Sequence, residues 1–450
     1  MDLLKKHFFL PLRRNYEPYE MASRLDLLIL GATGFTGKHC IGPILKMSKA
    51  NGRNLSWGVA GRSEDKLDKV LKEMGEKLGE NLDSIPKVIV DINSEEDLKV
   101  MAQKAKVVVN CCGPYRFLGE AVVKACVEAG THHVDVSGEP QYMEKMQLKY
   151  HQVAQEKGVY VVSACGFDSI PCDMGVVFMQ QNFEGTLNSV KTYLTAWTEG
   201  DVTGPLVNYG TWHSLVYGLA HADELKGLRR QLYPTRTPKL KPEVKTNMLP
   251  HRVDGVKGWV LPFLGSDKSV ARRSQRYFLD KQEKRPVQVD TYFTVPSVFA
   301  VFLLSIFGLI FTIFTKFNLG IQLLLKYPEF FSGGYFSKES PSEKLTESTK
   351  FKMTFHGEGW REKLRNVMDS SKTTDEKIVA TVEGTNPGYG ATCVSLVTCA
   401  IMILTEKNKL PAGGGVYSPG ACFAKTSMIK ELNENGLKFE MVSKKEIDNK

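Results

Sequence analysis

A glycine-rich turn near the start of the chain constrains its fold more than any other feature. Gly31-Ala-Thr-Gly-Phe-Thr-Gly37 directly follows the apolar run Leu25–Leu30, and a helical pattern continues over residues 38–50. Glycines at this spacing let the backbone turn tightly and approach a pyrophosphate, and the free N–H groups of the next helix attract the anion. We therefore predict a dinucleotide site rather than a structural turn. The residues expected to hold the nucleotide here are Gly31, Thr33, Gly34, Phe35, Thr36 and Gly37.

The end of the second predicted strand indicates which dinucleotide binds. The strand at residues 56–60 ends in Gly61-Arg62-Ser63, whereas NAD-binding folds usually place an acidic residue there. The guanidinium of Arg62 suits a 2′-phosphate, and Ser63 adds a hydroxyl at the start of the following helix. We therefore expect NADP(H) to be favoured over NAD(H). The alternative is that Arg62 only caps a solvated helix.

Strands and helices alternate through the first part of the chain. Uninterrupted β-branched and apolar strands separated by helices predict a parallel sheet covered on both faces. Further strands are expected at residues 87–90, 107–110, 133–136 and 159–163, and helices at 64–79, 95–105 and 120–129. Ligands of such sheets lie beyond the carboxyl ends of the strands. This rule adds Asp91, Cys111 and Gly113 to the predicted cofactor site.

The later part of the chain has a different pattern. Strand-like segments at 187–196, 350–357 and 377–383 are too widely spaced for simple β-α-β units. The predicted fold class is α/β, with an N-terminal Rossmann-type parallel sheet and a second, mixed α+β domain that carries an apolar membrane-associating segment. The predicted divisions are a disordered extension at 1–20, a Rossmann domain at 21–165, a substrate domain at 166–388, and a C-terminal helix and tail at 389–450 that pack back on the first domain. Organelle targeting is the alternative for residues 1–20.

Composition excludes several classes of protein. A chain of 450 residues, 42% hydrophobic and 24% charged, can bury a large core. Its nine cysteines show no C-x-x-C spacing, so we expect no metal site, no disulfide framework and a reducing compartment.

Two adjacent segments of the second domain have unusual compositions. Residues 226–285 hold 16 Lys and Arg against five Asp and Glu, a net charge of +11, and prolines at 234, 238, 242 and 250 predict that much of this segment is a loop. Residues 291–315 contain no charged side chain. An apolar stretch of about 20 residues can cross a bilayer, and a basic block beside it is attracted to anionic lipids. We predict attachment to a membrane or lipid droplet, by spanning or by an interfacial hairpin; the alternative is a buried core or dimer helix. Nucleic acid is not an expected partner, because no binding motif accompanies the charge.

Two turns at the predicted cofactor edge carry the candidate catalytic residues. Tyr115, with Arg116 beside it, follows the fourth strand, and Asp168, with Ser169 beside it, follows the sixth. Hydride transfer usually needs a proton donor within hydrogen-bond reach of the substrate, which a phenol or a carboxyl group supplies. The alternatives are that Tyr115 packs under the cofactor and that Asp168 caps a helix.

Five motifs together resemble the saccharopine dehydrogenase family. They are Gly31–Gly37, Ala60-Gly-Arg-Ser63, Asn110-Cys-Cys-Gly-Pro-Tyr115, Asp135-Val-Ser-Gly-Glu139 and Gly166-Phe-Asp-Ser-Ile-Pro171. The resemblance extends from Met21 to the C-terminus and implies a Rossmann domain, a mixed α/β domain and a nicotinamide-dependent redox step. Related bacterial members resemble trans-acting enoyl reductases that work on lipid-linked substrates.

The combined expectation is an NADP(H)-dependent oxidoreductase that reduces a lipid-like enoyl or carbonyl substrate. The alternative is a catalytically idle nucleotide-binding scaffold on lipid surfaces. We expect an intracellular, membrane-associated protein, at lipid droplets or mitochondria, with a homodimer as an open alternative. Lysine catabolism is the weaker interpretation, because a membrane-attached segment suits an apolar substrate better than a water-soluble one.

Overall fold

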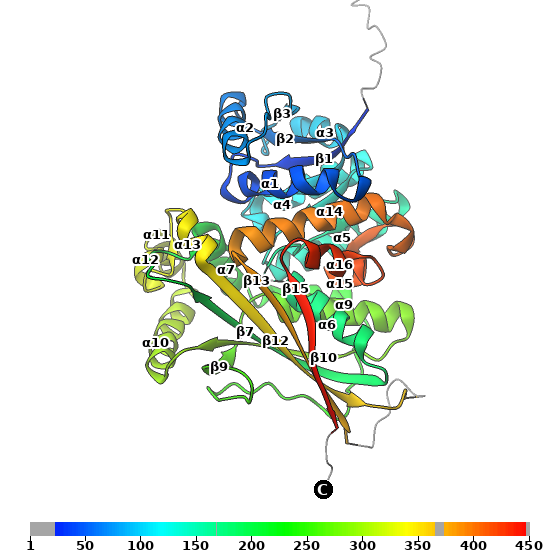
Figure 1. Cartoon of the computed structure of the whole chain (residues 1–450), viewed down its shortest axis with the longest axis vertical. Coiled ribbons are helices and arrows are strands. Elements are labelled where there is room, and N and C mark those ends of the chain that lie inside the picture. The colour runs from blue at the N-terminus through cyan, green and yellow to red at the C-terminus, as the bar shows by residue number, and fades with distance from the viewer. Residues whose placement is uncertain (1–22, 168, 365–372, 447–450) are drawn as a thin grey trace, which may run out of the picture.

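The computed structural model describes residues 23–167, 169–364 and 373–446. Two large sheets, one above the other in Figure 1, organise this part of the chain. This arrangement confirms the predicted fold class, an N-terminal parallel sheet joined to a second, mixed sheet.

The first sheet consists of seven parallel strands in the order β14-β6-β5-β4-β1-β2-β3. The strands are β1 (Leu25–Leu30), β2 (Trp57–Gly61), β3 (Lys87–Ile89), β4 (Ala105–Asn110), β5 (His132–Asp135), β6 (Tyr160–Val162) and β14 (Gly415–Tyr417). The connecting helices are α1 (Phe35–Lys49), α2 (Glu64–Leu78), α3 (Glu95–Gln103), α4 (Tyr115–Ala129) and α5 (Pro140–Glu156), with a short 3₁₀ turn η1 (Ala50–Gly52) after α1. Residues 27–30 and 107–109 are almost completely buried, as expected for central strands covered on both faces.

The second sheet is mixed, with strand order β15-β13-β12-β7-β10-β9. Only β7 and β10 pair in parallel; the other neighbours are antiparallel. The strands are β7 (Thr186–Thr198), β9 (Trp259–Pro262), β10 (Gln288–Val295), β12 (Thr349–Trp360), β13 (Glu376–Thr385) and β15 (Lys438–Glu446). Helices α6 (Ile170–Asn182) and α9 (Asp267–Gln282) pack on this sheet, and α8 (Glu224–Leu232) packs on α5 of the first domain.

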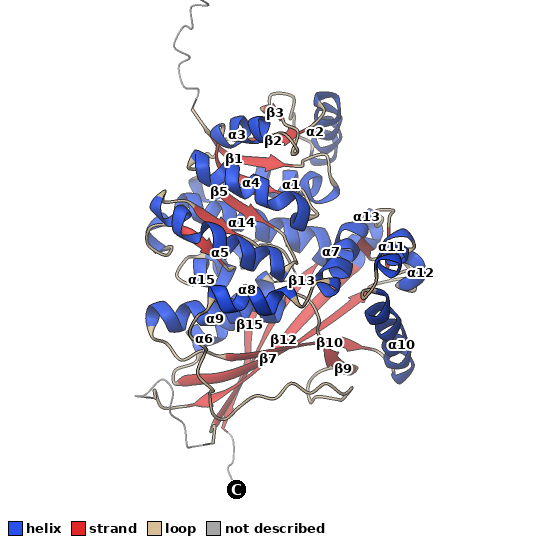
Figure 2. Cartoon of the chain, turned by 180° about the vertical axis from the view of Figure 1, so that it is seen from behind, coloured by secondary structure: helices blue, strands red, loops and turns tan. Residues whose placement is uncertain are grey.

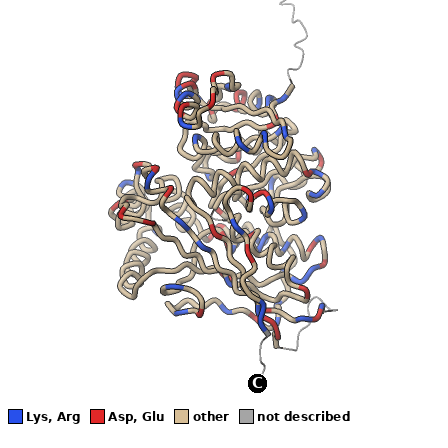
Figure 3. The backbone as a smooth tube through the Cα atoms, viewed as in Figure 1, with Lys and Arg blue, Asp and Glu red and all other residues tan. Residues whose placement is uncertain are grey.

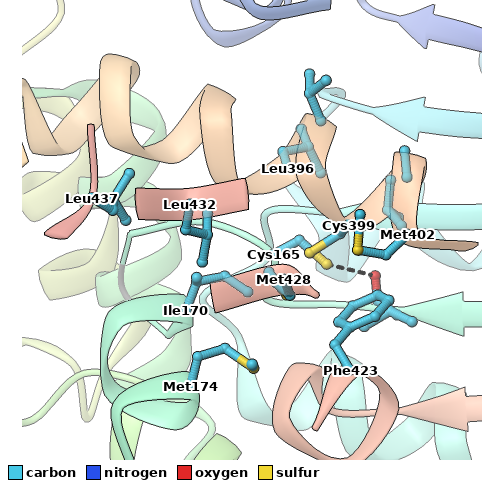
Figure 4. Packing of buried hydrophobic residues seen from close by; sticks show 14 of the residues in the cluster. Cys165, Ile170, Met174, Leu396, Cys399, Met402, Phe423, Met428, Leu432 and Leu437 are labelled. Atoms are coloured by element: carbon cyan, nitrogen blue, oxygen red, sulfur yellow. Dashed lines mark hydrogen bonds between the residues drawn. The ribbon is translucent and has the colours of Figure 1, made fainter. Parts of the chain in front are cut away.

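The C-terminal region joins the two sheets. Its elements are η2 (Pro387–Ala391, a π-helical turn), α14 (Thr392–Thr405), η3 (Lys407–Lys409), α15 (Pro419–Phe423) and α16 (Met428–Glu434). Helix α14 packs on α1, β4 and β5. Figure 4 shows its Leu396, Cys399 and Met402 in one apolar cluster with Ile170 and Met174 of α6. Residues 389–450, expected to pack back on the first domain, are divided in the structure, because α14 and β14 join the first domain whereas β15 pairs with β13 of the second sheet.

A smaller lobe projects from the second domain. It consists of α7 (Tyr209–Ala220), α10 (Val298–Phe314), α11 (Asn318–Lys326), α12 (Pro328–Phe331) and the two-stranded sheet of β8 (Val207–Asn208) and β11 (Phe336–Ser337), and we call it the apolar lobe. Short helix α13 (Glu343–Ser348) leads back to the second sheet. Figure 2 shows this lobe beside the second sheet, with α10 next to β9 and β10.

The apolar segment predicted at 291–315 is not a single helix. Its first five residues belong to β10, and α10 contains 17 residues, a length of about 26 Å. Only Val301 and Phe311 of α10 are buried, and Figure 3 shows no charged residue along it. Among the described helices, the one long and apolar enough to cross a membrane is Pro387–Thr405, but 72% of its most apolar stretch lies buried inside the protein.

The basic segment 226–285 is more ordered than its prolines predict. Much of it was expected to be a loop, yet most of α8 and all of α9 lie in it, and its longest stretch without a helix or strand is residues 233–258. Helix α9 forms because Val270, Ser274 and Phe278 are spaced by four residues and turn one buried face toward the core. The four prolines all fall in the loop.

Candidate functional site

The glycine turn is packed so tightly that side chains are excluded at two of its positions. Gly31 has φ +83°, and a Cβ added there would lie 2.5 Å from the Sγ of Cys112. A Cβ at Gly37 would lie 2.2 Å from the carbonyl oxygen of Gly31 and 2.8 Å from the Cα of Ala32. The backbone of β1 and the first turn of α1 are therefore in direct contact, as a phosphate cradle requires.

The N-terminus of α1 is open to an anion. Gly34 precedes the helix with an extended backbone and no side-chain cap, and the first turn contains no acidic residue. Thr33 and Gly34 are exposed, whereas Phe35 and Thr36 are half-buried. The uncapped N–H groups and the positive end of the helix dipole favour a bound phosphate group here. The predicted residues Gly31, Thr33, Gly34, Phe35 and Thr36 are thus at least partly accessible, whereas Gly37 is buried beneath them.

Arg62 lies at the carboxyl end of β2 with its side chain exposed. It makes no hydrogen bond or ion pair with any described residue. Its neighbour Ser63 caps α2, because the Ser63 Oγ accepts a hydrogen bond from the Lys66 N–H at 3.4 Å. Asp91, at the end of β3, is held by Asn93, whose backbone and side-chain N–H groups both donate to Asp91 Oδ1 at 3.0 Å. The Asn93 backbone bond and the nearby Arg62 charge lower the pKa of Asp91.

The turn after β4 lies against the glycine turn. Cys111 donates its N–H to the Leu30 carbonyl oxygen, and the Cys111 Sγ lies 3.9 Å from the Sγ of Cys40 in α1. Gly113 is exposed, so the backbone there is accessible. The structure thus brings together the predicted residues from the ends of β1 and β4. Strands β2 and β3 pair in parallel beside β1, so their carboxyl ends lie at the same edge of the sheet.

Of the two candidate catalytic residues, the structure describes Tyr115 but not Asp168. The Tyr115 side chain is buried, its hydroxyl donates to the Asn110 carbonyl oxygen at 3.0 Å, and it accepts the Val136 N–H at 3.4 Å. Burial raises the pKa of this phenol. Arg116 forms an ion pair with Glu224 at the start of α8. Asp168 lies outside the described residues, and the buried Ser169 Oγ lies 3.1 Å from the Ser266 Oγ before α9.

Two acidic residues at the end of β5 were assigned no role from the sequence. Asp135 is fully buried and accepts hydrogen bonds from the hydroxyls of Tyr142 at 3.0 Å and Ser163 at 2.9 Å, and burial raises its pKa to about 6. Glu139 is 2% exposed, accepts the Ser214 hydroxyl of α7 at 3.0 Å, and has its pKa raised by burial. Carboxyl groups with perturbed pKa values at the carboxyl edge of a parallel sheet are functional candidates. The sequence signal was their position just after a buried strand.

Comparison with known proteins agrees with this geometry. Residues 27–162 match the family model described as the saccharopine dehydrogenase NADP binding domain. The human saccharopine dehydrogenase-like oxidoreductase is 41% identical over 425 residues, covering 94% of this chain and 98% of that protein. The chain belongs to the saccharopine dehydrogenase-like oxidoreductase family. The resemblance drawn from the five sequence motifs is therefore confirmed, and with it an oxidoreductase with an NADP-binding domain.

Other members of the family carry more varied names. A Caenorhabditis elegans relative named lipid droplet localized protein is 36% identical, covering 94% of this chain and 99% of its own. A Mycobacterium tuberculosis relative named putative trans-acting enoyl reductase is 27% identical, covering 92% and 97%. The solved saccharopine dehydrogenase (L-Glu forming) of Saccharomyces cerevisiae superposes with a TM-score of 0.54 over 93% of this chain and 100% of that chain, at 14% identity, which supports the shared fold.

Proposed function

We propose that this family member is an NADP(H)-dependent reductase that acts on a lipid-like enoyl or carbonyl substrate at a membrane or lipid-droplet surface. The observation that carries the proposal is the exposed apolar side of α10, part of the same domain that faces the cofactor edge. Phe299 is 68% exposed, Leu309 63% and Ile313 52%. A contiguous apolar surface of this kind usually marks an interaction with a membrane or a partner protein. A water-soluble substrate would not require it.

The cofactor half of the proposal rests on the fit of the glycine turn. The excluded side chains at Gly31 and Gly37 and the uncapped start of α1 suit a pyrophosphate, held by the backbone of residues 31–37. Arg62 and Ser63 are proposed to hold the 2′-phosphate of NADP(H), with Asp91, Cys111 and Gly113 completing the crevice. The unpaired Arg62 supports a preference over NAD(H), since a guanidinium without a carboxylate partner is available to a phosphate.

The bound nicotinamide would supply a hydride, and the chain would supply orientation and a proton. We keep Tyr115 and Asp168 as the proposed proton donors. For Tyr115 this role requires the hydroxyl to exchange its bond with the Asn110 carbonyl for one with the substrate. Glu139 and Ser214 join the β5 edge to α7 and can hold a proton between the two domains.

The names of the two distant relatives support the substrate class and the location. One is named for lipid droplets and the other for enoyl reduction, and both align over more than nine-tenths of this chain. The 17-residue length of α10 and its packing on α7 favour an interfacial attachment over a full crossing. A mitochondrial membrane remains the second proposed location, and a homodimer through α10 is the alternative to lipid contact.

NADPH oxidation tests the reductase against the idle scaffold. Purified full-length protein is mixed with NADPH and vesicles made from a membrane lipid extract. The absorbance of the reduced nicotinamide is expected to fall as NADPH is oxidised. Tyr115→Phe is expected to lower the turnover roughly a hundredfold and to leave NADPH affinity nearly unchanged, because a positioned proton donor contributes about that factor. NADPH that binds but is never oxidised with any lipid fraction would favour the scaffold.

Arg62→Ala tests the choice of nucleotide. The variant is expected to lose at least about tenfold in affinity for NADPH, since a charge-assisted hydrogen bond contributes about 1.5–3 kcal/mol. NADH, which lacks the 2′-phosphate, should lose little. Fluorescence titration of both nucleotides measures the two effects, and Lys66→Ala, which removes a neighbouring exposed cation from α2, is the control. An equal loss for both nucleotides would contradict the assignment.

A further inference from the structure

A cavity of about 560 Å³ lies where the two domains meet, and its lining is strongly cationic. It is bounded by α5, α7, α8, α9 and the loop after β9. Six cations line it, against Glu144 as the only carboxylate among the described lining residues: Arg229, Arg236, Lys268, Arg272, Arg273 and Arg276. We call it the arginine cavity. All six cations come from the basic segment 226–285, which holds 16 Lys and Arg in total.

Three of these cations are neutralised by carboxylates of the fold. Arg229 donates from its Nε and Nη2 to both oxygens of Glu144, at 2.8–3.1 Å. Lys268 pairs with Asp290, and Arg276 pairs with Asp280. These pairs account for half of the positive charge; the first joins α8 to α5, and the second joins α9 to β10.

The other three cations have no carboxylate partner among the described residues. Arg236 and Arg272 are exposed and make no hydrogen bond or ion pair with any described residue. Arg273 is 6% exposed and donates to the Gln147 side-chain oxygen at 2.7 and 2.9 Å, but its buried Nη1 has no hydrogen-bond partner in the described chain. A buried guanidinium atom without a hydrogen-bond partner is costly. Arg273 also lines a neighbouring cavity together with Gln147, so Arg236 and Arg272 are the unpaired cations that belong to the arginine cavity alone.

The cavity also has an apolar wall that faces the apolar lobe. Leu215, Leu219 and Leu225 line it from α7 and α8, and Phe263 and Leu264 line it from the loop after β9; Leu264 is 68% exposed. Helix α7, which belongs to the apolar lobe, connects the cavity to α10. Its residues 214, 215, 218 and 219 line the cavity, while Trp212 packs on Phe311 of α10 at 5.1 Å between ring centroids and donates from Nε1 to the Leu324 carbonyl oxygen at 2.8 Å.

The other end of the cavity reaches the predicted cofactor edge. Gly138 and Pro140, which line it, flank Glu139 at the carboxyl end of β5. A ligand in the arginine cavity therefore lies between the sheet edge where hydride transfer is proposed and the helix that carries the lipid-facing surface.

We propose that the arginine cavity binds the phosphorylated head of an amphiphile whose apolar chain lies along the apolar wall of the cavity. A phosphate monoester carries a charge of about −1.5 to −2 at neutral pH, which suits three unneutralised cations better than a single carboxylate does. The cavity volume accommodates such a head with the start of its chain. This inference rests on the proposed function and specifies its substrate class: an anionic lipid-like molecule rather than a neutral one.

Binding of dodecyl phosphate below its micelle concentration tests the inference without any turnover. Calorimetric titration uses the full-length protein saturated with NADPH, so that the nucleotide site is blocked. The double variant Arg236→Ala/Arg272→Ala is expected to lose at least about tenfold in affinity, because each charge-assisted hydrogen bond contributes about 1.5–3 kcal/mol. The charge-matched control Lys226→Ala/Arg230→Ala, on exposed positions of the same basic segment outside the cavity, is expected to bind within about twofold of the parent.

Two further probes separate the head from the chain. Inorganic phosphate is expected to bind much more weakly than dodecyl phosphate. Neutral dodecyl maltoside is expected to bind the parent and the arginine variant with the same affinity. Equal binding of dodecyl phosphate to the parent and the arginine variant overturns the inference, as does equal binding of phosphate and dodecyl phosphate. Arginine-dependent binding without any lipid-driven NADPH oxidation would leave the cavity assignment standing and contradict the reductase. If a neutral lipid drives NADPH oxidation at a rate that the arginine substitutions do not change, the reductase stands and the cavity assignment is wrong.

Discussion

Gly37→Ala is expected to abolish measurable NADPH binding, with an affinity loss of about a hundredfold or more. The added methyl group would lie 2.2 Å from the Gly31 carbonyl oxygen and 2.7 Å from its carbonyl carbon. These are backbone atoms, so α1 must move away from the end of β1, and the N–H groups that face the phosphates move with it. Losing two charge-assisted hydrogen bonds costs about 3–6 kcal/mol. Overpacking of this kind also lowers the free energy of unfolding by about 1–3 kcal/mol.

The matched control is Gly42→Ala in the same helix. Its added methyl group would lie 3.7 Å from the Leu78 side chain, an ordinary contact, and alanine is favoured over glycine inside a helix by about 1 kcal/mol. This variant is expected to bind NADPH normally and to unfold at a slightly higher temperature. Fluorescence titration and thermal denaturation measure both properties. If Gly37→Ala bound NADPH like the parent, the glycine turn would not be the nucleotide site.

The first domain was largely predictable because its signals are local. The turn at residues 31–37 and the buried strands β1 and β4 are each marked by a sequence pattern within a few positions. Helix α5 was missed because its buried residues, such as Tyr142 and Met146, are interspersed with polar ones. Strand β14 has three residues and joins the sheet from more than 250 positions away, a pairing that no local pattern reveals.

The second domain was less predictable for a related reason. The arrangement β15-β13-β12-β7-β10-β9 brings distant segments side by side, and its edge strands β9 and β15 have no strong apolar alternation. The arginine cavity shows the same limit for function. The charge of segment 226–285 was evident from the sequence, but attraction to a lipid surface was the interpretation it suggested. Only the folded positions of α5, α7, α8 and α9 show that six of these cations line one open cavity.

Replacing the exposed apolar side chains of α10 is expected to release the protein from lipid surfaces. Phe299, Phe302, Leu309 and Ile313 are between 52% and 68% exposed, and the fold itself places no charge on this helix. Fully burying one such side chain contributes about 1.5–3 kcal/mol, so changing all four to glutamine should lower the partition coefficient by roughly a thousandfold or more. Glutamine retains good helix propensity, so α10 is expected to remain folded. Flotation with phosphatidylcholine vesicles and with triolein droplets measures the partitioning.

The control for this variant removes apolar surface from the opposite part of the molecule. Ile89, Val100 and Val153 are 50%, 41% and 40% exposed in the first domain, and their replacement by glutamine is expected to leave partitioning unchanged. Both variants keep Val301, Phe311 and Phe314, which pack α10 on the rest of the chain. A loss of partitioning in the α10 variant alone therefore reports on the exposed side. If the parent protein does not float with either lipid and instead runs as a dimer that the α10 variant dissociates, this surface joins two copies of the chain, and the proposed lipid attachment is wrong.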